Sequence, residues 1–522
     1  MANWKTRAAG ITLLIATVWY IPWLVTSLNW QMPWLSLPFG LANLFVVIMT
    51  LVTALNHWSH SRPDTKLAAP GEEPAVAVIV PTYGEPPEMV YQTAKSVLDQ
   101  DYPIQQIRLI ISDDAHRPAM RRVVERMCQE YPLACATYHD PYRRGDLRRR
   151  GDAKSGNLNS ALDSVDGTYA DIAFVETRDA DDLVGDPTFL RQVIGQLLAD
   201  PKAAFVQTIK EAHVSEGDPF GNLEPMFYLR AMLARHAANS VFPCGSGLVW
   251  RQEALDDIGG FPDWNLVEDL QSGVEALRRG WRGVYLPIVG AFGQTAPEDT
   301  PNVIKQRGTW ALDTMRLVLW ANKKGLNFRQ RLQFLELGLF YVLSFAVLMF
   351  LVTPIIALTF EIYPLVTDQV TYALVFWPYA LAVELFILSL ADGLPYEAVW
   401  RARQTWLGLA PVYATATILA LIYGPNRKPV YRVTRKEHVY GWYWREVLPQ
   451  MLLIMALIGA SVYHVATRSL LAVADLGSLF WAVIFVMALS RTVINSWHGL
   501  QPLRSGLRAA RHTLSRSVQV GK

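Results

Sequence analysis

The sequence predicts an α/β domain with an open, mostly parallel sheet, inserted between two groups of transmembrane helices. The 522 residues are 51% hydrophobic, and a mean hydropathy of +0.16 is too high for an ordinary soluble enzyme of this length. Long uncharged runs lie in the first 60 residues and after residue 333. Between them, short apolar runs alternate with polar turns and helical stretches, which is typical of α/β folds.

Residues 1–60 predict two transmembrane helices. No Asp, Glu, Lys or Arg occurs from residue 8 to residue 61, and Pro33 and Pro38 interrupt the run near its middle. Helices over roughly 9–28 and 38–58 fit, because about 20 apolar residues cross the hydrocarbon core of a bilayer. Basic residues precede the first run without a cleavage site of small residues, so we expect a retained anchor.

Residues 61–333 predict one cytosolic domain. The continuous apolar run at 75–80 is typical of a parallel strand buried on both faces, and we expect further strands at 107–111 and 172–175. Asp113 and Asp114 follow the second strand, and Asp179 and Asp181 follow the third. Ligands of open α/β sheets bind beyond the carboxyl ends of the strands, so these carboxylates mark the expected site. The first pair suits a nucleoside, and the D-x-D pair suits a hard divalent cation.

The region after residue 333 predicts four more spans. We expect two helices in 334–393 and two in 447–492, with an amphipathic helix pair and a loop at the cytosolic interface in 394–446. Basic residues flank that middle segment on both sides, which would break the positive-inside pattern if it crossed the membrane. The topology then closes on six spans and a basic cytosolic tail, 493–522. Glu384 in the fourth span is expected to line a channel or to pair with another group.

Charge and cysteine content exclude several classes of protein. The formal net charge of +2 gives no global field that would attract nucleic acid, so we expect no nucleic-acid partner. The three cysteines lack CxxC spacing and have no histidine arrangement suited to zinc. We therefore expect neither a structural zinc site nor a disulfide framework.

Six short motifs follow one another along the chain. They are Lys154-Ser-Gly-Asn-Leu-Asn159, the D-x-D pair, Phe242-Pro-Cys-Gly-Ser246, Val267-Glu-Asp269, Gln306-Arg-Gly-Thr-Trp310 and Tyr431-Arg-Val-Thr-Arg-Lys436. Their order resembles that of processive family 2 glycosyltransferases of the cellulose-synthase-like branch, the bacterial cellulose or curdlan synthase type. The resemblance covers nearly the whole chain. It implies a cytosolic glycosyltransferase domain of the GT-A type in a multi-pass protein of the plasma (inner) membrane.

The resemblance implies a donor site with several named members. The uridine would contact Thr82, Tyr83, Glu85 and either Asp113 or Asp114. Lys154, Gln306 and Arg307 would lie near the donor, and Asp179 and Asp181 would hold Mg²⁺ or Mn²⁺. Thr434 and Lys436 would belong to a gating loop that closes over the bound donor and stabilises charge on its leaving group.

The resemblance also implies how the acceptor is held. Asp269, preceded by Glu268, would be the general base that deprotonates the acceptor hydroxyl, with inversion at the anomeric carbon. Cys244, Gly245 and Ser246 would form the platform for the acceptor terminus, and Trp310 would stack on a sugar at the mouth of the channel. Thr309 departs from the family pattern, which has arginine at this place, so the arginine's assistance to the diphosphate would fall to another residue or the linkage would differ.

The function implied is a processive, inverting β-glucan synthase that uses UDP-glucose and secretes a β-1,4- or β-1,3-linked polymer. The alternatives are a hyaluronan- or chitin-like synthase with another UDP-sugar, a non-processive transferase that glycosylates a lipid carrier, and a membrane transporter or binding module with structural carboxylates. The partners expected are the donor, the growing polysaccharide, the bilayer and export proteins of the periplasm or outer membrane. Arg504 and Arg508 match an R-x-x-x-R motif, but the few residues after them make no barrel, so we expect no cyclic-di-GMP domain.

Overall fold

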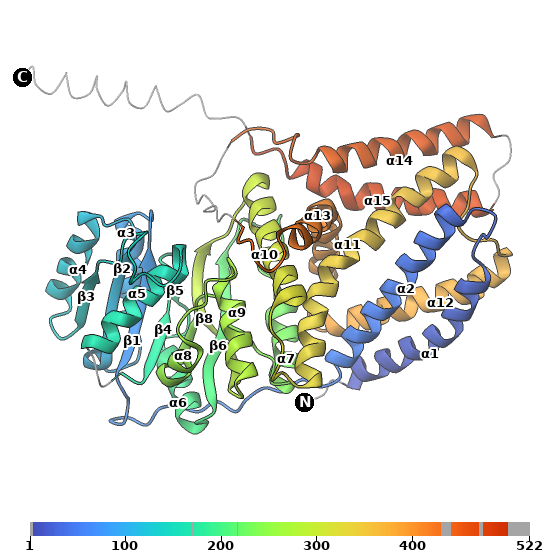
Figure 1. Ribbon diagram of the computed structural model, residues 1–522. Coiled ribbons are helices and arrows are strands. Elements are labelled where there is room, and N and C mark those ends of the chain that lie inside the picture. The colour runs from blue at the N-terminus through green and yellow to red at the C-terminus, as the bar shows by residue number, and fades with distance from the viewer. Residues whose placement is uncertain (1–3, 169–171, 217, 430–439, 469–472, 500–522) are drawn as a thin grey trace, which may run out of the picture.

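The computed structural model describes residues 4–168, 172–216, 218–429, 440–468 and 473–499. An α/β domain lies at one end and a bundle of long helices at the other (Figure 1). Two helices, α7 (Met232–Ala237) and α10 (Thr300–Trp320), lie where the two parts meet. The predicted order of helices, α/β domain and further helices is the order that the structure has.

Within the described residues, eight strands form one sheet in the order β3-β2-β1-β4-β7-β6-β8-β5. Their bounds are β1 Val76–Thr82, β2 Ile107–Asp113, β3 Cys135–His139, β4 Phe174–Thr177, β5 Leu183–Val184, β6 Ala203–His213, β7 Leu248–Arg251 and β8 Arg282–Thr295. The pairs β1–β2, β1–β4, β2–β3 and β6–β8 are parallel. The pairs β4–β7, β6–β7 and β5–β8 are antiparallel. The sheet is therefore mostly parallel, with β7 and the short edge strand β5 running in the opposite direction.

Both faces of the sheet are covered by helices, which explains the uninterrupted apolar strands. Val76, Val78 and Val80 of β1 join the core under one layer of helices, whereas Ala77 and Ile79 join the core under the other. The first layer comprises α3 (Pro87–Leu98), α4 (Pro118–Glu130) and α6 (Phe189–Ala199), and the second comprises α5 (Ala153–Thr168), α8 (Gln252–Ile258) and α9 (Glu268–Arg278). Two short helical turns, η1 (Ile104–Gln106) and η2 (Phe227–Ala231), complete the domain.

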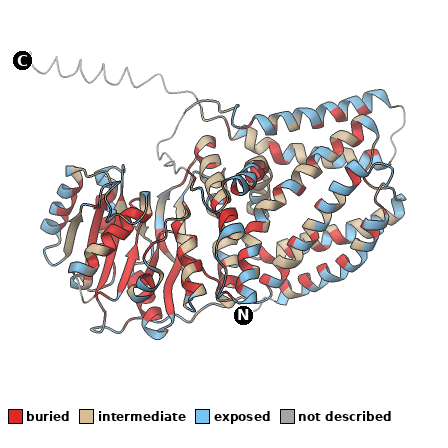
Figure 2. Ribbon diagram, viewed as in Figure 1, coloured by how far each residue is buried: buried red, intermediate tan, exposed pale blue. Residues whose placement is uncertain are grey.

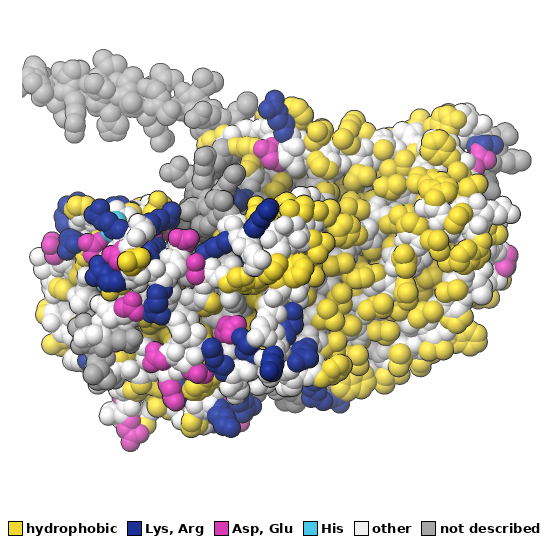
Figure 3. Space-filling view, in the orientation of Figure 1, with side chains coloured by type: hydrophobic (Ala, Val, Ile, Leu, Met, Phe, Trp, Pro, Cys, Tyr) yellow, Lys and Arg dark blue, Asp and Glu magenta, His cyan; other side chains and the backbone are white. Residues whose placement is uncertain are grey.

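Seven helices within the described residues are long and apolar enough to cross a membrane. They are α1 (Trp4–Thr26), α2 (Pro33–Asn56), α11 (Phe328–Phe360), α12 (Gln369–Leu390), α13 (Tyr396–Tyr423), α14 (Leu448–Thr467) and α15 (Val473–Ile494). Exposed residues follow the outer faces of these helices (Figure 2). Hydrophobic side chains cover the bundle, and charged ones gather on the α/β domain (Figure 3). This division is that of a membrane-embedded part and a water-exposed part.

The segment expected to be a pair of interfacial helices is instead one continuous helix, α13. Small buried residues such as Gly408, Ala410 and Ala414 let α13 approach its neighbours closely, and it packs along its length against α10, α11 and α15. In Figure 1 it is seen nearly end-on, whereas the other six candidate spans run across the picture. Glu384 of α12 pairs with Arg403 of α13 at 2.8 Å. α13 has the length and composition of a membrane span. Its location along the interface therefore stays a prediction.

Candidate active site

A cavity of about 2060 Å³ lies at the carboxyl ends of the parallel strands and continues between the membrane helices. Thr82 at the end of β1, Asp114 after β2 and Asp179 after β4 border its part in the α/β domain. Its other part is bordered by residues of α2, α11, α12 and α15, among them Thr53, Glu336, Ile387 and Ile484. Ligand pockets commonly measure about 300–1,000 Å³. This cavity therefore has room for two substrates side by side.

The lysine of the first motif joins two of the acidic motifs. Nζ of Lys154, from the first turn of α5, lies 2.6 Å from Oδ1 of Asp179 and 3.6 Å from Oε1 of Glu268. It also donates to the carbonyl of Gly245 at 3.0 Å. Burial alone would lower the pKa of Lys154, but the Asp179 and Glu268 carboxylates outweigh it and raise the pKa above its ordinary value. Lys154 thus brings a fixed positive charge to the place where the acidic motifs meet.

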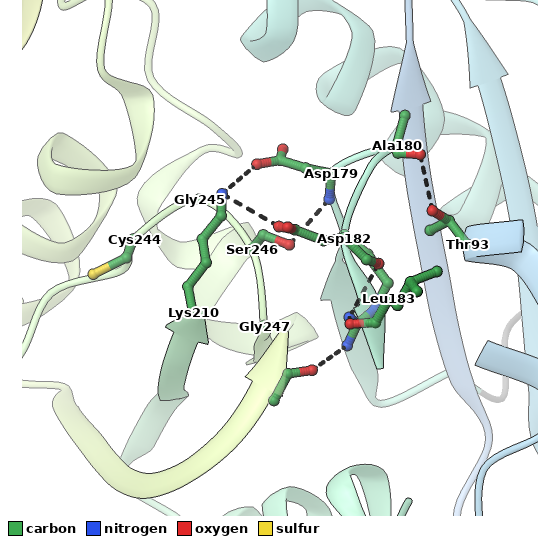
Figure 4. Close-up of polar contacts among 12 residues, drawn as sticks. Thr93, Asp179, Ala180, Asp182, Leu183, Lys210, Cys244, Gly245, Ser246 and Gly247 are labelled. Atoms are coloured by element: carbon green, nitrogen blue, oxygen red, sulfur yellow. Dashed lines mark hydrogen bonds and ion pairs between the residues drawn. The ribbon is translucent and has the colours of Figure 1, made fainter. Parts of the chain in front are cut away.

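A second lysine, which sequence reasoning missed, also reaches the D-x-D segment. Nζ of Lys210, on β6, lies 2.7 Å from Oδ2 of Asp179 and 3.3 Å from Oδ2 of Asp182 (Figure 4). Burial would raise the pKa of Asp179, but Lys154 and Lys210 outweigh it and hold the pKa well below its usual range. Lys210 stands in no motif that the sequence displays. Lys210 also lies in the polar second half of β6, beside Glu211, so its residue type alone gave no signal.

The predicted general base also lies near Lys154. Asp269 is the second residue of α9, and its Oδ1 accepts a hydrogen bond from the backbone N–H of Leu270 at 2.7 Å. Burial and the neighbouring Glu268 raise the pKa of Asp269 to about 7. A carboxylate with this pKa is half deprotonated near neutral pH, which is the range suited to a general base. The raised pKa is therefore compatible with the general-base role that the resemblance implies for Asp269, and that role stays a prediction.

The predicted nucleoside end of the site is held by two arginines. Arg117 pairs with Asp113 at 2.9 Å and donates to Oγ1 of Thr82 at 2.9 Å. Arg149 makes a two-pronged pair with Asp114 at 2.6 and 3.0 Å. Asp113 is fully buried and does not border the cavity, whereas Asp114 does. Of the two aspartates left open by the sequence, Asp114 is the one that a ligand could reach.

The carboxylate of Glu85 stabilises the turn after β1 through hydrogen bonds. Oε2 of Glu85 accepts hydrogen bonds from Oγ1 of Thr82 at 2.9 Å and from the backbone N–H groups of Tyr83 and Gly84 at 2.8 and 3.1 Å. Thr82, Tyr83 and Glu85 all border the cavity. Glu85 thus shapes the wall of the cavity, and the half-exposed ring of Tyr83 is left as its accessible surface.

The helix that carries the last described motif forms the wall toward the membrane. Gln306, Arg307, Thr309 and Trp310 of α10 all border the cavity, and the Arg307 guanidinium lies 4.9 Å from the centre of the Trp310 ring. Arg307 forms an ion pair with Glu224 and donates to the carbonyl of Gly221 at 3.2 Å. Arg307 is therefore already bound to the loop before η2, and these contacts would have to break before it could bind a diphosphate.

The predicted acceptor platform is divided by the structure. Cys244 and Gly245 border the cavity, but Ser246 is fully buried, and its Oγ accepts a hydrogen bond from the backbone N–H of Asp179 at 3.1 Å. Ser246 is thus placed to position the D-x-D segment. Burial, reinforced by the nearby Asp269, raises the pKa of the Cys244 thiol, which keeps it protonated and unsuited to act as a nucleophile.

The predicted cation site would offer two protein carboxylates, Asp179 and Asp181, and leave other coordination positions to a substrate. Asp179 and Asp181 both border the cavity and carry the carboxylate oxygens that Mg²⁺ and Mn²⁺ take as ligands. Among the residues that the structure describes, no group of three or more His, Cys, Asp or Glu side chains could hold a metal ion. The pair fits a cation that shares its ligands with substrate phosphates, as Mg²⁺ commonly does. Thr434 and Lys436 of the predicted gating loop lie outside the described residues.

Comparison with known proteins identifies relatives among the glycosyltransferases. Residues 74–312 match the sequence profile described as glycosyltransferase-like family 2. The chain is 30% identical over 372 residues to the UDP-forming cellulose synthase catalytic subunit of Pseudomonas fluorescens, which covers 68% of this chain and 47% of that protein. It is 28% identical over 367 residues to the cellulose synthase 1 catalytic subunit of Komagataeibacter xylinus, with 66% and 46% covered. The chain thus spans about half the length of these two relatives.

A solved structure supports the fold. The mannosyltransferase PcManGT of Pyrobaculum calidifontis, in complex with GDP-mannose and Mn²⁺, superposes with a TM-score of 0.52 at 20% sequence identity. The match covers 73% of this chain and 99% of that protein. The likeness establishes the GT-A arrangement of the sheet and its helices.

Proposed function

We propose that this chain, whose residues 74–312 are a family 2 glycosyltransferase domain of GT-A fold, polymerises a β-glucan from UDP-glucose with inversion and passes the product through its own membrane helices. The observation that carries the proposal is a single cavity bordered by Asp179, Asp269 and Trp310 that continues between the membrane helices. A donor, an acceptor and an exit path would share that space. The printed names of the UDP-forming relatives support a UDP-sugar as donor.

The proposed chemistry needs a base and a cationic environment at one reaction centre. Asp269, with a pKa of about 7, would take the proton from the acceptor hydroxyl as that oxygen attacks the anomeric carbon. Lys154 lies between Asp179 and Glu268 and would place positive charge near the departing diphosphate. Direct displacement by the acceptor oxygen inverts the anomeric carbon, and no covalent enzyme intermediate is required.

Asp179 and Asp181 would hold a divalent cation together with the diphosphate oxygens. Such a cation supplies charge that stabilises the leaving diphosphate. The ion pairs of Asp179 would have to rearrange, because both of its carboxylate oxygens lie within 2.7 Å of an ammonium group.

A second candidate function has an observation of its own. In the membrane part of the cavity, α11 contributes Leu337, Leu343 and Val347, and Ile387 and Ile484 come from α12 and α15. An aliphatic wall suits a hydrocarbon chain as well as the apolar face of a sugar. This favours a non-processive transferase that adds one sugar to a lipid carrier as the alternative.

The nature of the product separates the two. Purified protein in detergent should be incubated with radiolabelled UDP-glucose, UDP-N-acetylglucosamine or UDP-galactose in the presence of Mg²⁺ or Mn²⁺. The proposal predicts a water-insoluble or high-molecular-weight product from UDP-glucose that β-1,4- or β-1,3-specific glucanases degrade. Label that instead extracts into butanol as a glycolipid would support the lipid-carrier function, and label from another UDP-sugar would replace the donor.

A further inference from the structure

Lys210 lies at the donor end of the cavity but belongs to none of the motifs. It comes from β6, borders the cavity, and its side chain is 11% exposed. The pairing of β6 with β8 shifts register between Ile209 and Lys210. Such irregularities bend strands locally and re-aim side chains beside active sites. The backbone thus presents the Lys210 ammonium at the D-x-D segment, rather than leaving it on a regular strand.

The two lysines occupy both oxygens of one carboxylate. Lys154 takes Oδ1 of Asp179 at 2.6 Å, and Lys210 takes Oδ2 at 2.7 Å. A cation that binds through Asp179 must displace at least one of these ammonium groups, because like charges repel at such distances. The two lysine ammonium groups therefore contact the same Asp179 oxygens that a metal ion would need as ligands.

The two ammonium groups differ in what else holds them. Lys154 is also bonded to the Gly245 carbonyl at 3.0 Å, and Glu268 is close by. The second partner of Lys210 is the carboxylate of Asp182, at 3.3 Å. Asp182 is fully buried and does not border the cavity, so it stays in place as a partner for Lys210 when the contact to Asp179 is exchanged. Lys210 can thus release Asp179 without leaving the D-x-D segment.

We propose that Lys210 is a diphosphate-binding residue that exchanges its bond to Asp179 for the phosphate oxygens when a metal-bound nucleoside diphosphate sugar enters. This inference rests on the proposed function, since it assumes a nucleotide-sugar donor. It gives the site a cationic group that the arginine missing at Thr309 would otherwise supply. Lys210 then has two opposing effects: it competes with a metal for Asp179 in the empty site, and it strengthens binding of the diphosphate in the filled one.

These opposing effects are measurable without any product. Binding of UDP in the presence of Mn²⁺ is measured by calorimetry on the purified full-length protein, and binding of Mn²⁺ alone is measured from the spin-resonance signal of the free ion. Lys210→Met should weaken UDP binding by about ten- to a hundred-fold, as expected for one charge-assisted hydrogen bond. The same variant should bind Mn²⁺ alone more tightly than wild type. Lys210→Arg should restore most of the UDP affinity.

The controls separate this role from a structural one. Lys202→Met alters an exposed lysine just before the same strand and should change neither affinity. Lys210→Met with Asp182→Asn removes both members of the buried pair and should show the same two opposite shifts if the single variant is poorly folded. UDP affinity of Lys210→Met equal to wild type, or loss of Mn²⁺ and UDP binding together in that variant, would overturn the proposal. Because the readout is nucleotide binding, a wrong product or linkage would contradict the proposed function and leave this inference standing.

Discussion

Gly245 packs directly against the carboxylate of Asp269, so that a methyl group on its α-carbon would stand 3.1 Å from Oδ2 of Asp269. The same methyl group would lie 3.4 Å from Nζ of Lys154. Gly245 also has a φ of +84°, in the left-handed region that favours glycine. The absence of a side chain at Gly245 therefore lets Asp269, the proposed base, and Lys154 both lie close to this turn.

Gly245→Ala should lower the transfer rate strongly, because its methyl group pushes on Asp269 and Lys154 and also strains the backbone. Gly259→Ala is the matched control, since Gly259 has a similar φ of +83° with nothing within 4 Å of the added methyl group. Both variants should lose about 1 kcal/mol or somewhat more of folding stability. Only Gly245→Ala should also lose activity per folded molecule, measured as incorporation of labelled sugar. Equal activity of the two variants would mean that Gly245 serves only the turn.

The activity should depend on pH through Asp269. Its pKa is raised from the ordinary 3.8 to about 7, first by burial and then by Glu268. The base works only as the carboxylate, so kcat/KM should level off above pH 7 and fall about tenfold per pH unit below it. The profile is measured with saturating metal between pH 5.5 and 8.5. A flat profile over that range would remove Asp269 from the role of base.

The midpoint of that profile should move when the neighbouring carboxylate is neutralised. Glu268 raises the pKa of Asp269 by charge repulsion, so Glu268→Gln should shift the midpoint to lower pH. Glu275→Gln changes a carboxylate on the same helix that pairs with Arg278 at 2.7 Å and serves as the control. A midpoint that stays in place in Glu268→Gln, or moves upward, would contradict the charge coupling between the two carboxylates.

The sequence predicted the parts of the fold that depend on uninterrupted apolar segments. The run at 75–80 became β1, and the long uncharged runs became the membrane helices, because burial on both faces of a sheet or in lipid leaves little freedom in residue type. β7 has only four residues and runs against its neighbours, and no periodicity reveals so short a strand. The single helix α13 was not expected, because the basic residues on both sides of this segment favoured a pair of helices at the interface.

The motifs predicted which residues lie near the site, but not which of their side chains face the cavity and which are buried. Asp179, Lys154, Gly245 and Asp269 all meet in one cavity, as their motifs implied. Asp113, at the end of β2, and Ser246, in the motif of Gly245, were also expected at the site, but both are buried and bind Arg117 and the backbone of Asp179. Lys210 could not be predicted, because a lone lysine in a strand becomes significant only when the sheet brings it to Asp179.

Thr309→Arg should strengthen donor binding. Thr309 borders the cavity and donates only to the Lys305 carbonyl one turn earlier, at 2.8 Å. Arg307 cannot readily take over the missing guanidinium's role, because Glu224 and the Gly221 carbonyl already engage it. An arginine at 309 should therefore lower KM for the UDP-sugar several-fold, as expected for a charge-assisted contact to phosphate. The neutral variant Thr309→Gln is the control, and an unchanged KM in Thr309→Arg would indicate that Arg307 already serves the diphosphate.

The most direct test of the account compares wild type with Asp269→Asn in one preparation, measuring both UDP binding and the incorporation of glucose from UDP-glucose. We expect the variant to bind UDP in the presence of Mn²⁺ as wild type does, because Asp269 is proposed to act on the acceptor hydroxyl and not to bind the nucleotide or the cation. Its transfer rate should fall by about 10² to 10⁴, the contribution typical of a general base. Wild-type transfer rates in Asp269→Asn, or no sugar transfer by wild type from any UDP-sugar, would contradict the assignment of this cavity as a glycosyltransferase active site.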